Sequence, residues 1–328
     1  MSLEIGRQGY VGLAIESVAG TPESSPATFI PFTDNTIVAK HEPVLDISAR
    51  ASRVKDFNAV TGKKWSEGDL AMYADASQSG YLLKLALGQE AMSTVTGNVR
   101  EHLFYPTVSG NSPTSATLWV YRGDDVDINQ HAYAVVDTLS IEVDNGDEPG
   151  MITASVIANS PTSVAAPTLS TVSGNIFTFK DMTVQFGSSY AAALAATATK
   201  VQSFSMELAN NVEALYRSGS NTPDSFIMGE LEVTGEYTVF LENDTEVDAY
   251  KNLEKRCMVV SFAGAGIGSG YTERLQLIFH KAVIEDHSPA VGLDEVMAIT
   301  QSFRCLQSTN PNPGYFEARL RNLKTTAY

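Results

Sequence analysis

The sequence predicts a mainly β protein built from two similar domains in tandem, each flanked by one short helix. Three observations indicate this fold class. Apolar and polar residues alternate with a period of two along much of the chain, as in strands with one buried face. Helical periodicity is limited to two short segments, and residue types recur at a spacing of 167 positions. The 328 residues are enough for two domains with separate cores.

The most regular predicted strand covers residues 230–242. Leucine, valine and tyrosine lie on one face of this segment, and Glu230, Glu232, Glu236 and Glu242 lie on the other. Because neighbouring side chains of a strand point to opposite sides of the sheet, the glutamate face must contact water or a polar partner.

Two hairpins are predicted elsewhere in the chain. Residues 135–158 form one, with a break at Asn145 and Gly146, and residues 273–286 pair with residues 296–306 in the other. Both follow the same alternation of apolar and polar residues.

The two helices are predicted over residues 77–87 and 245–255. Each follows a polar stretch, in which Ser77 and Asp244 are the candidate N-cap residues. The two segments occur in similar contexts, which indicates an internal duplication.

A shift of 167 positions brings Gly62 onto Gly229 and Gly68 onto Gly235. Further pairs at this spacing are Asp46 with Glu213, Arg50 with Arg217, Asp69 with Glu236, Tyr73 with Phe240, Asp75 with Glu242 and Leu83 with Tyr250. We therefore predict a first domain over residues 1–160 and a second over 175–328. Residues 161–174 belong to a stretch rich in Pro, Ser, Thr and Ala, which is typical of a linker.

The composition argues against several classes of protein. Lys and Arg number 22 and Asp and Glu 38, so the formal charge is −16, which disfavours proteins that hold nucleic acid through clustered cations. Charged residues make up 18% and hydrophobic residues 43%, as in a folded globular chain. The sequence begins without a signal-peptide pattern and has no apolar run long enough to span a bilayer, so we expect no export and no membrane insertion.

No segment has the pattern of a catalytic or metal site. The glycine-rich residues 264–270 lie between two predicted strands, so they are interpreted as a hairpin tip and not as a phosphate loop. Residues 124–127 are interpreted as an acidic turn, because the spacing of calcium ligands is missing. The acidic group at residues 285–287 and 294–295 is interpreted as a solvated loop without a nucleophile.

The remaining reactive residue types are expected to be structural. The five histidines are scattered, and Cys257 and Cys305 are expected to be buried thiols. Trp65 and Trp119 are expected to pack within sheets. We therefore expect no enzyme activity, no metal and no cofactor.

Two long polar loops are predicted, over residues 42–61 and 210–228. Connections of this length are usually functional or disordered. They contain a concentration of positive charge, at Arg50, Arg53, Lys55 and Arg217.

Several segments, taken in order, resemble tail tube proteins of long-tailed bacteriophages. These segments are residues 9–22 (GYVGLAIESVAGTP), 29–33 (FIPFT), 177–181 (FTFKD), 201–216 (VQSFSMELANNVEALY) and 229–237 (GELEVTGEY). The resemblance implies a β-sandwich or half-barrel domain flanked by a short helix. It also implies six domains per ring and rings stacked into a tube through which DNA leaves the capsid.

Other expectations follow from this resemblance. Two domains per chain imply a ring of three chains, in place of the usual hexamer of single-domain chains. The resemblance implies a place in the virion tail, assembly in the bacterial host cytoplasm, and tail-tip, terminator and tape-measure proteins as partners. It also implies that the early loop reaches the next ring, so Arg50, Arg53, Lys55 and Arg217 are candidates for inter-ring contacts with acidic surface.

A channel for DNA must not hold phosphates, and an acidic lining would repel the duplex. The candidates for this lining are Glu67, Asp69, Asp75, Glu230, Glu232, Glu236 and Glu242. An outer, solvated position for the same face is the alternative, because alternation does not tell which face is turned inward.

Two other functions fit the composition. A decoration protein or an adhesin would share the β pattern without forming a tube. A glycan hydrolase would need two carboxylates at a defined separation, and the sequence does not single out such a pair.

Overall fold

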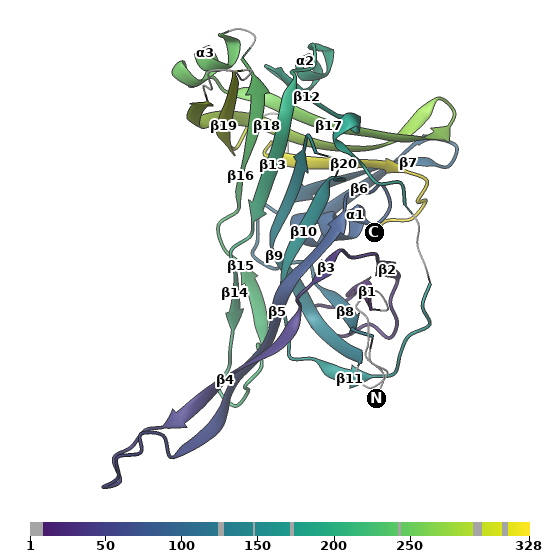
Figure 1. The fold of residues 1–328 in the computed structure, drawn as a ribbon. Helices are drawn as coiled ribbons and strands as arrows, with labels where there is room; N and C mark the ends of the chain where they lie inside the picture. Colours follow the sequence, from purple (N-terminus) through teal and green to yellow (C-terminus); the bar gives the residue numbers. More distant parts are fainter. Residues whose placement is uncertain are drawn as a thin grey trace.

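The computed structural model describes residues 9–123, 128–146, 148–170, 174–241, 244–290, 297–309 and 314–328 (Figure 1). Strands dominate these residues, and the α-helices among them are short, which confirms the prediction of a mainly β fold with short helices. The helices are α1 (Ser79–Leu87), α2 (Tyr190–Ala195) and α3 (Thr245–Lys251).

A continuous antiparallel sheet runs through both halves of the chain, with the strand order β4–β5–β10–β9–β13–β16–β19–β18. These strands are β4 (Val38–Asp46), β5 (Asn58–Tyr73), β10 (Met151–Ala158), β9 (Ile128–Asp144), β13 (Val201–Ala209), β16 (Glu232–Phe240), β19 (Ala298–Cys305) and β18 (Tyr271–Ala290). The β9–β13 pair joins the first half to the second, so one sheet surface crosses the whole molecule.

The long strands β9 and β18 each continue into a second set of strands. The first part of β9 pairs with β8, followed by β1 and β2, and the first part of β18 pairs with β17, followed by β12. These strands are β1 (Tyr10–Ile15), β2 (Thr28–Ile30), β8 (Ala116–Tyr121), β12 (Met182–Gly187) and β17 (Arg256–Gly268).

Smaller elements connect the two halves. The C-terminal strand β20 (Phe316–Asn322) pairs with β18 and with β7 (Val99–Pro106), and β7 forms a hairpin with β6 (Gly88–Thr96). Strands β3 (Asp34–Asn35) and β11 (Thr162–Val164) add to β5 and β9, and a 3-10 helix (Phe179–Asp181) precedes β12. Part of the predicted linker therefore forms a strand.

The two halves repeat one strand order. It is β4–β5–β10–β9–β8–β1 in the first half and β13–β16–β19–β18–β17–β12 in the second. Helix α1 follows β5 and packs against β9, and α3 follows β16 and packs against β18. The irregularities also correspond: both β8–β9 and β17–β18 contain a bulge, and so do β9–β10 and β18–β19.

The spacing between equivalent residues changes along the chain. Asp69 lies opposite Ser155 and Glu236 lies opposite Ser302, so Ser155 corresponds to Ser302. These serines are 147 positions apart, whereas Asp69 and Glu236 are 167 apart. The β6–β7 hairpin accounts for the change, because it is inserted after α1 and has no counterpart after α3.

Most predicted elements are observed. The predicted strand over 230–242 is β16, the predicted hairpins are β9–β10 and β18–β19, and residues 264–270 lie at the β17–β18 turn. The helices begin within two residues of their expected starts, although α3 ends at Lys251. Helix α2 was not predicted, because its alanine-rich turn and a half has no amphipathic period.

The prediction of two long polar loops is wrong. Residues 42–46 and 58–61 belong to β4 and β5, and residues 210–228 contain the hairpin of β14 (Val212–Leu215) and β15 (Ser225–Met228). The strand residues 42–46 and 58–61 are largely exposed, so no buried face imposes an alternating pattern on their sequence. Strands β14 and β15 are mostly half-buried, but each has only four residues, which is too short for a clear alternation.

The core lies on one face of the continuous sheet, beneath the helices and the second sets of strands. Its largest fully buried side chains include Phe104, Phe204, Tyr237, Phe279, Phe303 and Phe316. Burial stabilises the fold by about 1.5–3 kcal/mol for each large apolar side chain. Cys257 and Cys305 are buried free thiols, as expected, and Trp119 is buried as well.

Candidate functional site

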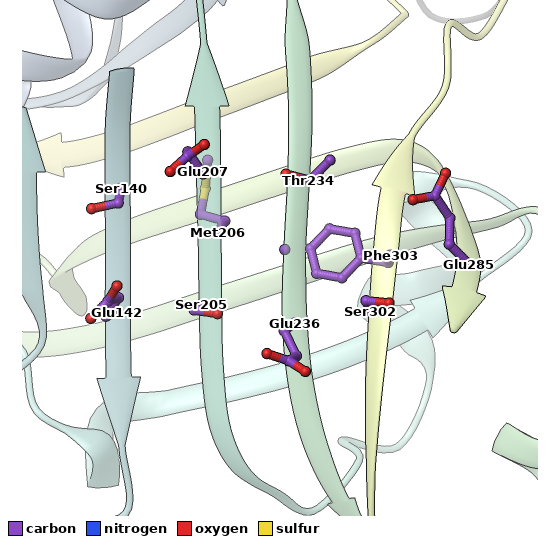
Figure 2. Close-up of a pocket in the computed structure, with 11 residues that line it drawn as sticks. Ser140, Glu142, Ser205, Met206, Glu207, Thr234, Glu236, Glu285, Ser302 and Phe303 are labelled. Carbon is purple, nitrogen blue, oxygen red and sulfur yellow. The ribbon is translucent and has the colours of Figure 1, made fainter. Parts of the chain in front are cut away.

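The opposite face of the sheet is polar across both halves. Cross-strand register places Glu142, Ser205, Glu236 and Ser302 in one row, on β9, β13, β16 and β19. Figure 2 shows these side chains around a shallow pocket on this face. Carboxylates and serines alternate, so the two glutamates stand two strands apart, about 9.5 Å at the usual strand spacing. This arrangement avoids like charges directly opposite each other, which would destabilise the sheet.

The neighbouring rows have the same character. Ser140, Glu207 and Thr234 are aligned on β9, β13 and β16, and Asp69 lies opposite Ser155. Hydroxyl groups and carboxylates therefore cover the face from β5 to β19. We call this surface the acidic face.

Arg304 is a cation at the β19 side of the acidic face. Its guanidinium is hydrogen-bonded to Glu232, and its Nε lies 2.6 Å from Oε1 of Glu285. These two carboxylates are therefore locally compensated. Among the described residues no cation is ion-paired with four exposed carboxylates of the acidic face, which are Asp69, Glu142, Glu207 and Glu236.

The structure brings several of the predicted lining residues onto this surface. Asp69, Glu232 and Glu236 lie on it, and Glu230 is exposed just before β16. Glu67 lies on β5, at the edge of the acidic face next to β4. Its carboxylate accepts a hydrogen bond from Trp65 Nε1 and lies 3.6 Å from Lys40 Nζ. Glu242 lies outside the described residues.

Asp75 does not belong to the acidic face. Its side chain is 3% exposed, and Oδ1 accepts hydrogen bonds from the N–H groups of Ser77, Gln78 and Ser79 at the start of α1. Burial raises the pKa of Asp75 above its usual value, although these donors oppose the rise. The expected channel position is therefore corrected to a capping role. The N-cap position is Gln78 and not the expected Ser77, and the side chain of Gln78 makes no capping hydrogen bond, so Asp75 accepts these hydrogen bonds in its place.

Two carboxylates of the acidic face, Glu142 and Glu207, are not among the sequence-predicted lining residues. The signal was present, since both alternate with buried residues in their strands. What the sequence did not show is that β9 and β13 are adjacent, because that pairing joins residues 59 to 71 positions apart.

The hairpin of β4 and β5 projects from the body of the molecule (Figure 1). We call residues 42–61 the arm. Its exposed apolar side chains are Val44, Leu45, Ile47, Val54 and Val60. Ile47 and Val54 are 63% and 61% exposed, so the free chain leaves them in water.

The candidate inter-ring cations differ in their local contacts. Arg50 is ion-paired with Asp46 and lies over the Phe57 ring, whereas Arg53 and Lys55 are exposed with no salt-bridge partner among the described residues. Arg50 therefore also stabilises the arm itself.

The β14–β15 hairpin of the second half packs back onto the first half. Phe226 is buried and meets the Tyr133 ring edge-on at 4.8 Å. The N–H of Lys64 donates to the carbonyl oxygen of Asn221, and Arg217 is ion-paired with Asp224 within the hairpin. Arg217 therefore belongs to a different hairpin from Arg50, Arg53 and Lys55 of the arm.

Possible catalytic groups are used in structural contacts. Glu285 and His287 lie on strand β18, not in the predicted solvated loop, and His287 stacks on Tyr250 and lies 3.2 Å from Gln301. Residues 294–295 and 124–127 lie outside the described residues. Within the described part of the chain, no group of three His, Cys, Asp or Glu residues is placed to hold a metal ion. No helix there is both long and apolar enough to cross a bilayer.

Comparison with known proteins identifies the family. A search of curated proteins finds no match. The family model described as phage tail tube protein matches residues 6–305, which is most of the chain. The continuous β surface and the projecting hairpin belong to this matched region. The chain is therefore a member of the phage tail tube protein family.

Proposed function

We propose that three copies of this chain close into a ring of six similar β units and that the rings stack into a tube. Each half of the chain supplies one unit. The acidic face lines the channel, and DNA passes along it without specific binding. As a member of the tail tube family, the protein is a structural component of the virion tail.

The continuity of the acidic face across β5, β10, β9, β13, β16 and β19 carries this proposal. Its opposite face is occupied by buried side chains such as Ile141, Phe204 and Val233, so a smooth channel can be lined only by the polar side. Serines, threonines and carboxylates there offer no cluster of phosphate-binding cations.

The four unpaired carboxylates give the acidic face a negative electrostatic potential. Their charge repels the phosphates of a duplex, and a narrow channel walled by protein strengthens that field. Arg304, a cation on this face, is held by Glu232 and Glu285 and is therefore a poor phosphate ligand. DNA can then slide without the salt-dependent contacts that would hold it.

The arm supports ring stacking. It extends beyond the sheet and presents apolar residues that would be buried against an adjacent ring (Figure 1). Arg53 and Lys55 would meet acidic surface there, although a single exposed ion pair contributes only about 0–1 kcal/mol. We further propose assembly in the host cytoplasm with tail-tip, terminator and tape-measure proteins.

Electron microscopy of the purified protein tests tube formation. Stacked rings with a hollow centre are expected, whereas compact particles would favour a decoration protein or an adhesin.

The channel assignment is tested by Glu142→Lys, Glu207→Lys and Glu236→Lys combined in phage particles. Tubes should form, and DNA ejection at low salt should slow, because phosphates would bind the new cations. Exposed carboxylates away from this face provide a matched control, the triple variant Glu148→Lys, Asp248→Lys and Glu254→Lys. Ejection that is equally fast in both variants would reject the channel assignment.

A further inference from the structure

The two halves are joined by the pair of β9 and β13. The strands equivalent to these two each have a neighbour on one side only in the single chain. β9 pairs with β13, and by the repeated strand order β18 corresponds to β9 and β4 to β13. Within the described residues, β4 pairs only with β5, and residues 286–290 of β18 pair only with β19. Each molecule thus has one open edge of each kind, at opposite ends of its continuous sheet.

The equivalence can be made residue by residue. Ser140 lies opposite Thr153 as Ser288 lies opposite Thr300, so Ser288 is the counterpart of Ser140. By the same reasoning Val38, opposite Glu67, is the counterpart of Glu207, which lies opposite Thr234. In the internal junction Glu207 lies opposite Ser140.

We infer that the ring closes by repeating this internal junction between chains, with β18 of one molecule antiparallel to β4 of the next. The inference rests on the proposed ring and names the strands and register that form it. The register places Lys40 opposite Asp286, Ala39 opposite His287, Val38 opposite Ser288 and Ile37 opposite Pro289. The partner is a second copy of this chain.

The charges fit this register. Lys40 and Asp286 are both exposed, and the pairing brings the ammonium group opposite the carboxylate on the polar side of the sheet. Opposite charges at directly paired positions stabilise adjacent strands, and like charges would destabilise them. Lys40 is 45% exposed and lies 3.6 Å from Glu67 in the single chain, so it can turn to the new partner.

The backbone hydrogen-bonding groups also fit at Pro289, the position of this edge that is least suited to strand pairing. Proline has no N–H to donate to a neighbouring strand, which makes Pro289 an unusual residue at a pairing edge. In this register it meets Ile37, whose carbonyl oxygen already accepts a hydrogen bond from the Arg122 guanidinium. The missing donor therefore faces a carbonyl that is already satisfied.

Burial gives a third point of agreement. Leu139 and Leu208 face each other in the internal junction and are both 0% exposed. Their counterparts His287 and Ala39 are half-buried and exposed in the single chain. Pairing between chains would cover this pair in the same way.

Disulfide trapping during assembly tests the register. The variant Val38→Cys/Ser288→Cys should give covalent two-chain and three-chain species under oxidation, because directly opposite strand positions lie within reach of a disulfide. The pseudo-symmetric variant Ser140→Cys/Glu207→Cys should instead form a bond within one chain. Burial raises the pKa of Cys257 to about 11 and of Cys305 to about 12, so the native thiols react little.

A matched negative control separates register from mere proximity. Thr300 lies opposite Ser288 on the next strand, β19, and would be two strands away from Val38. Its side chain points to the same face of the sheet, but the distance is too great for a disulfide, so Val38→Cys/Thr300→Cys should stay uncrosslinked. Tubes that form normally while Val38→Cys/Ser288→Cys gives no crosslink would overturn the register and leave the tube function standing. A ladder that continues to six chains would overturn the three-chain closure, and absence of tubes in the unmodified protein would overturn the proposed function itself.

Discussion

The first and second halves of the chain share one strand order, yet their hairpins have different surroundings. The arm of the first half projects and exposes five apolar side chains, whereas the β14–β15 hairpin packs Phe226 against Tyr133 of the other half. The same topological position therefore serves an internal contact in one half and leaves a surface for another molecule in the other half.

Two further differences separate the halves. His131 pairs with Leu118 at the β8–β9 position where Phe279 pairs with Met258 in the second half. The carboxylate of Asp75 accepts hydrogen bonds from three backbone N–H groups at the start of α1, whereas the side chain of Asp244, the N-cap residue of α3, makes no capping hydrogen bond. The first half thus has buried polar groups at His131 and Asp75, whereas the second half has the apolar Phe279 and an exposed helix start at Asp244.

The largest expected effect concerns the arm. Replacing Val44, Ile47 and Val54 by serine should reduce tube assembly at least tenfold, because burial of each side chain contributes about 1.5–3 kcal/mol and every ring repeats the contact. The folded monomer should keep its stability, since these residues are exposed in it. Sedimentation and electron microscopy measure the assembled fraction.

A control triple uses apolar residues that are equally exposed outside the arm. Val18→Ser, Val108→Ser and Leu169→Ser remove similar surface and should leave assembly unchanged. Equal loss of tubes in both triples would show that the arm has no special part in stacking.

The second prediction concerns pH and the His131 difference between the halves. Burial, together with the charge of Arg122, lowers the pKa of His131 to about 4. Since the unfolded chain has a histidine pKa of about 6.5, it binds more protons between these values. The free energy of unfolding should therefore fall by about 3 kcal/mol from this group as the pH drops from 6.5 to below 4.

The substitution His131→Phe introduces the residue type found at the equivalent position of the second half, Phe279. It should remove this part of the pH dependence of the free energy of unfolding. Urea unfolding of wild type and variant at pH 7 and pH 4 gives the free energy of unfolding of each protein. The contribution of the carboxylates cancels in the difference between the two proteins. His131→Gln serves as a second variant that keeps the polar contact to Ser66. Parallel pH profiles for all three proteins would contradict the assignment.

The smallest effect is expected at the helix starts. Asp75→Ala should destabilise α1 by about 1–2 kcal/mol through the loss of its cap, and Asp244→Ala should change α3 by less than about 0.5 kcal/mol. Amide hydrogen exchange should then accelerate roughly five- to thirtyfold in α1 and remain nearly unchanged in α3. Similar acceleration in the two helices would remove the distinction between them.

The sequence supported much of the local structure. Alternation identified β16 and the β9–β10 and β18–β19 hairpins, because one buried face imposes a period of two. It did not identify the strands of the arm, which are exposed on both faces and carry no such pattern. The sequence analysis also assigned Asp75 and Glu236 to the same channel lining. A carboxylate that caps a buried turn cannot be told from one that faces water by residue type alone.

What the sequence determined by itself is which residues can share a face, because the direction of each side chain follows from its position in a strand. Tertiary structure alone decided which strands are neighbours. The β9–β13 pair brings Glu142 and Glu207 onto one surface with Glu236, and it depends on contacts between segments far apart in the chain. Such pairing is set by the packing of the whole core and not by any local preference, so the acidic face and the open edges of β4 and β18 emerge only in the folded molecule.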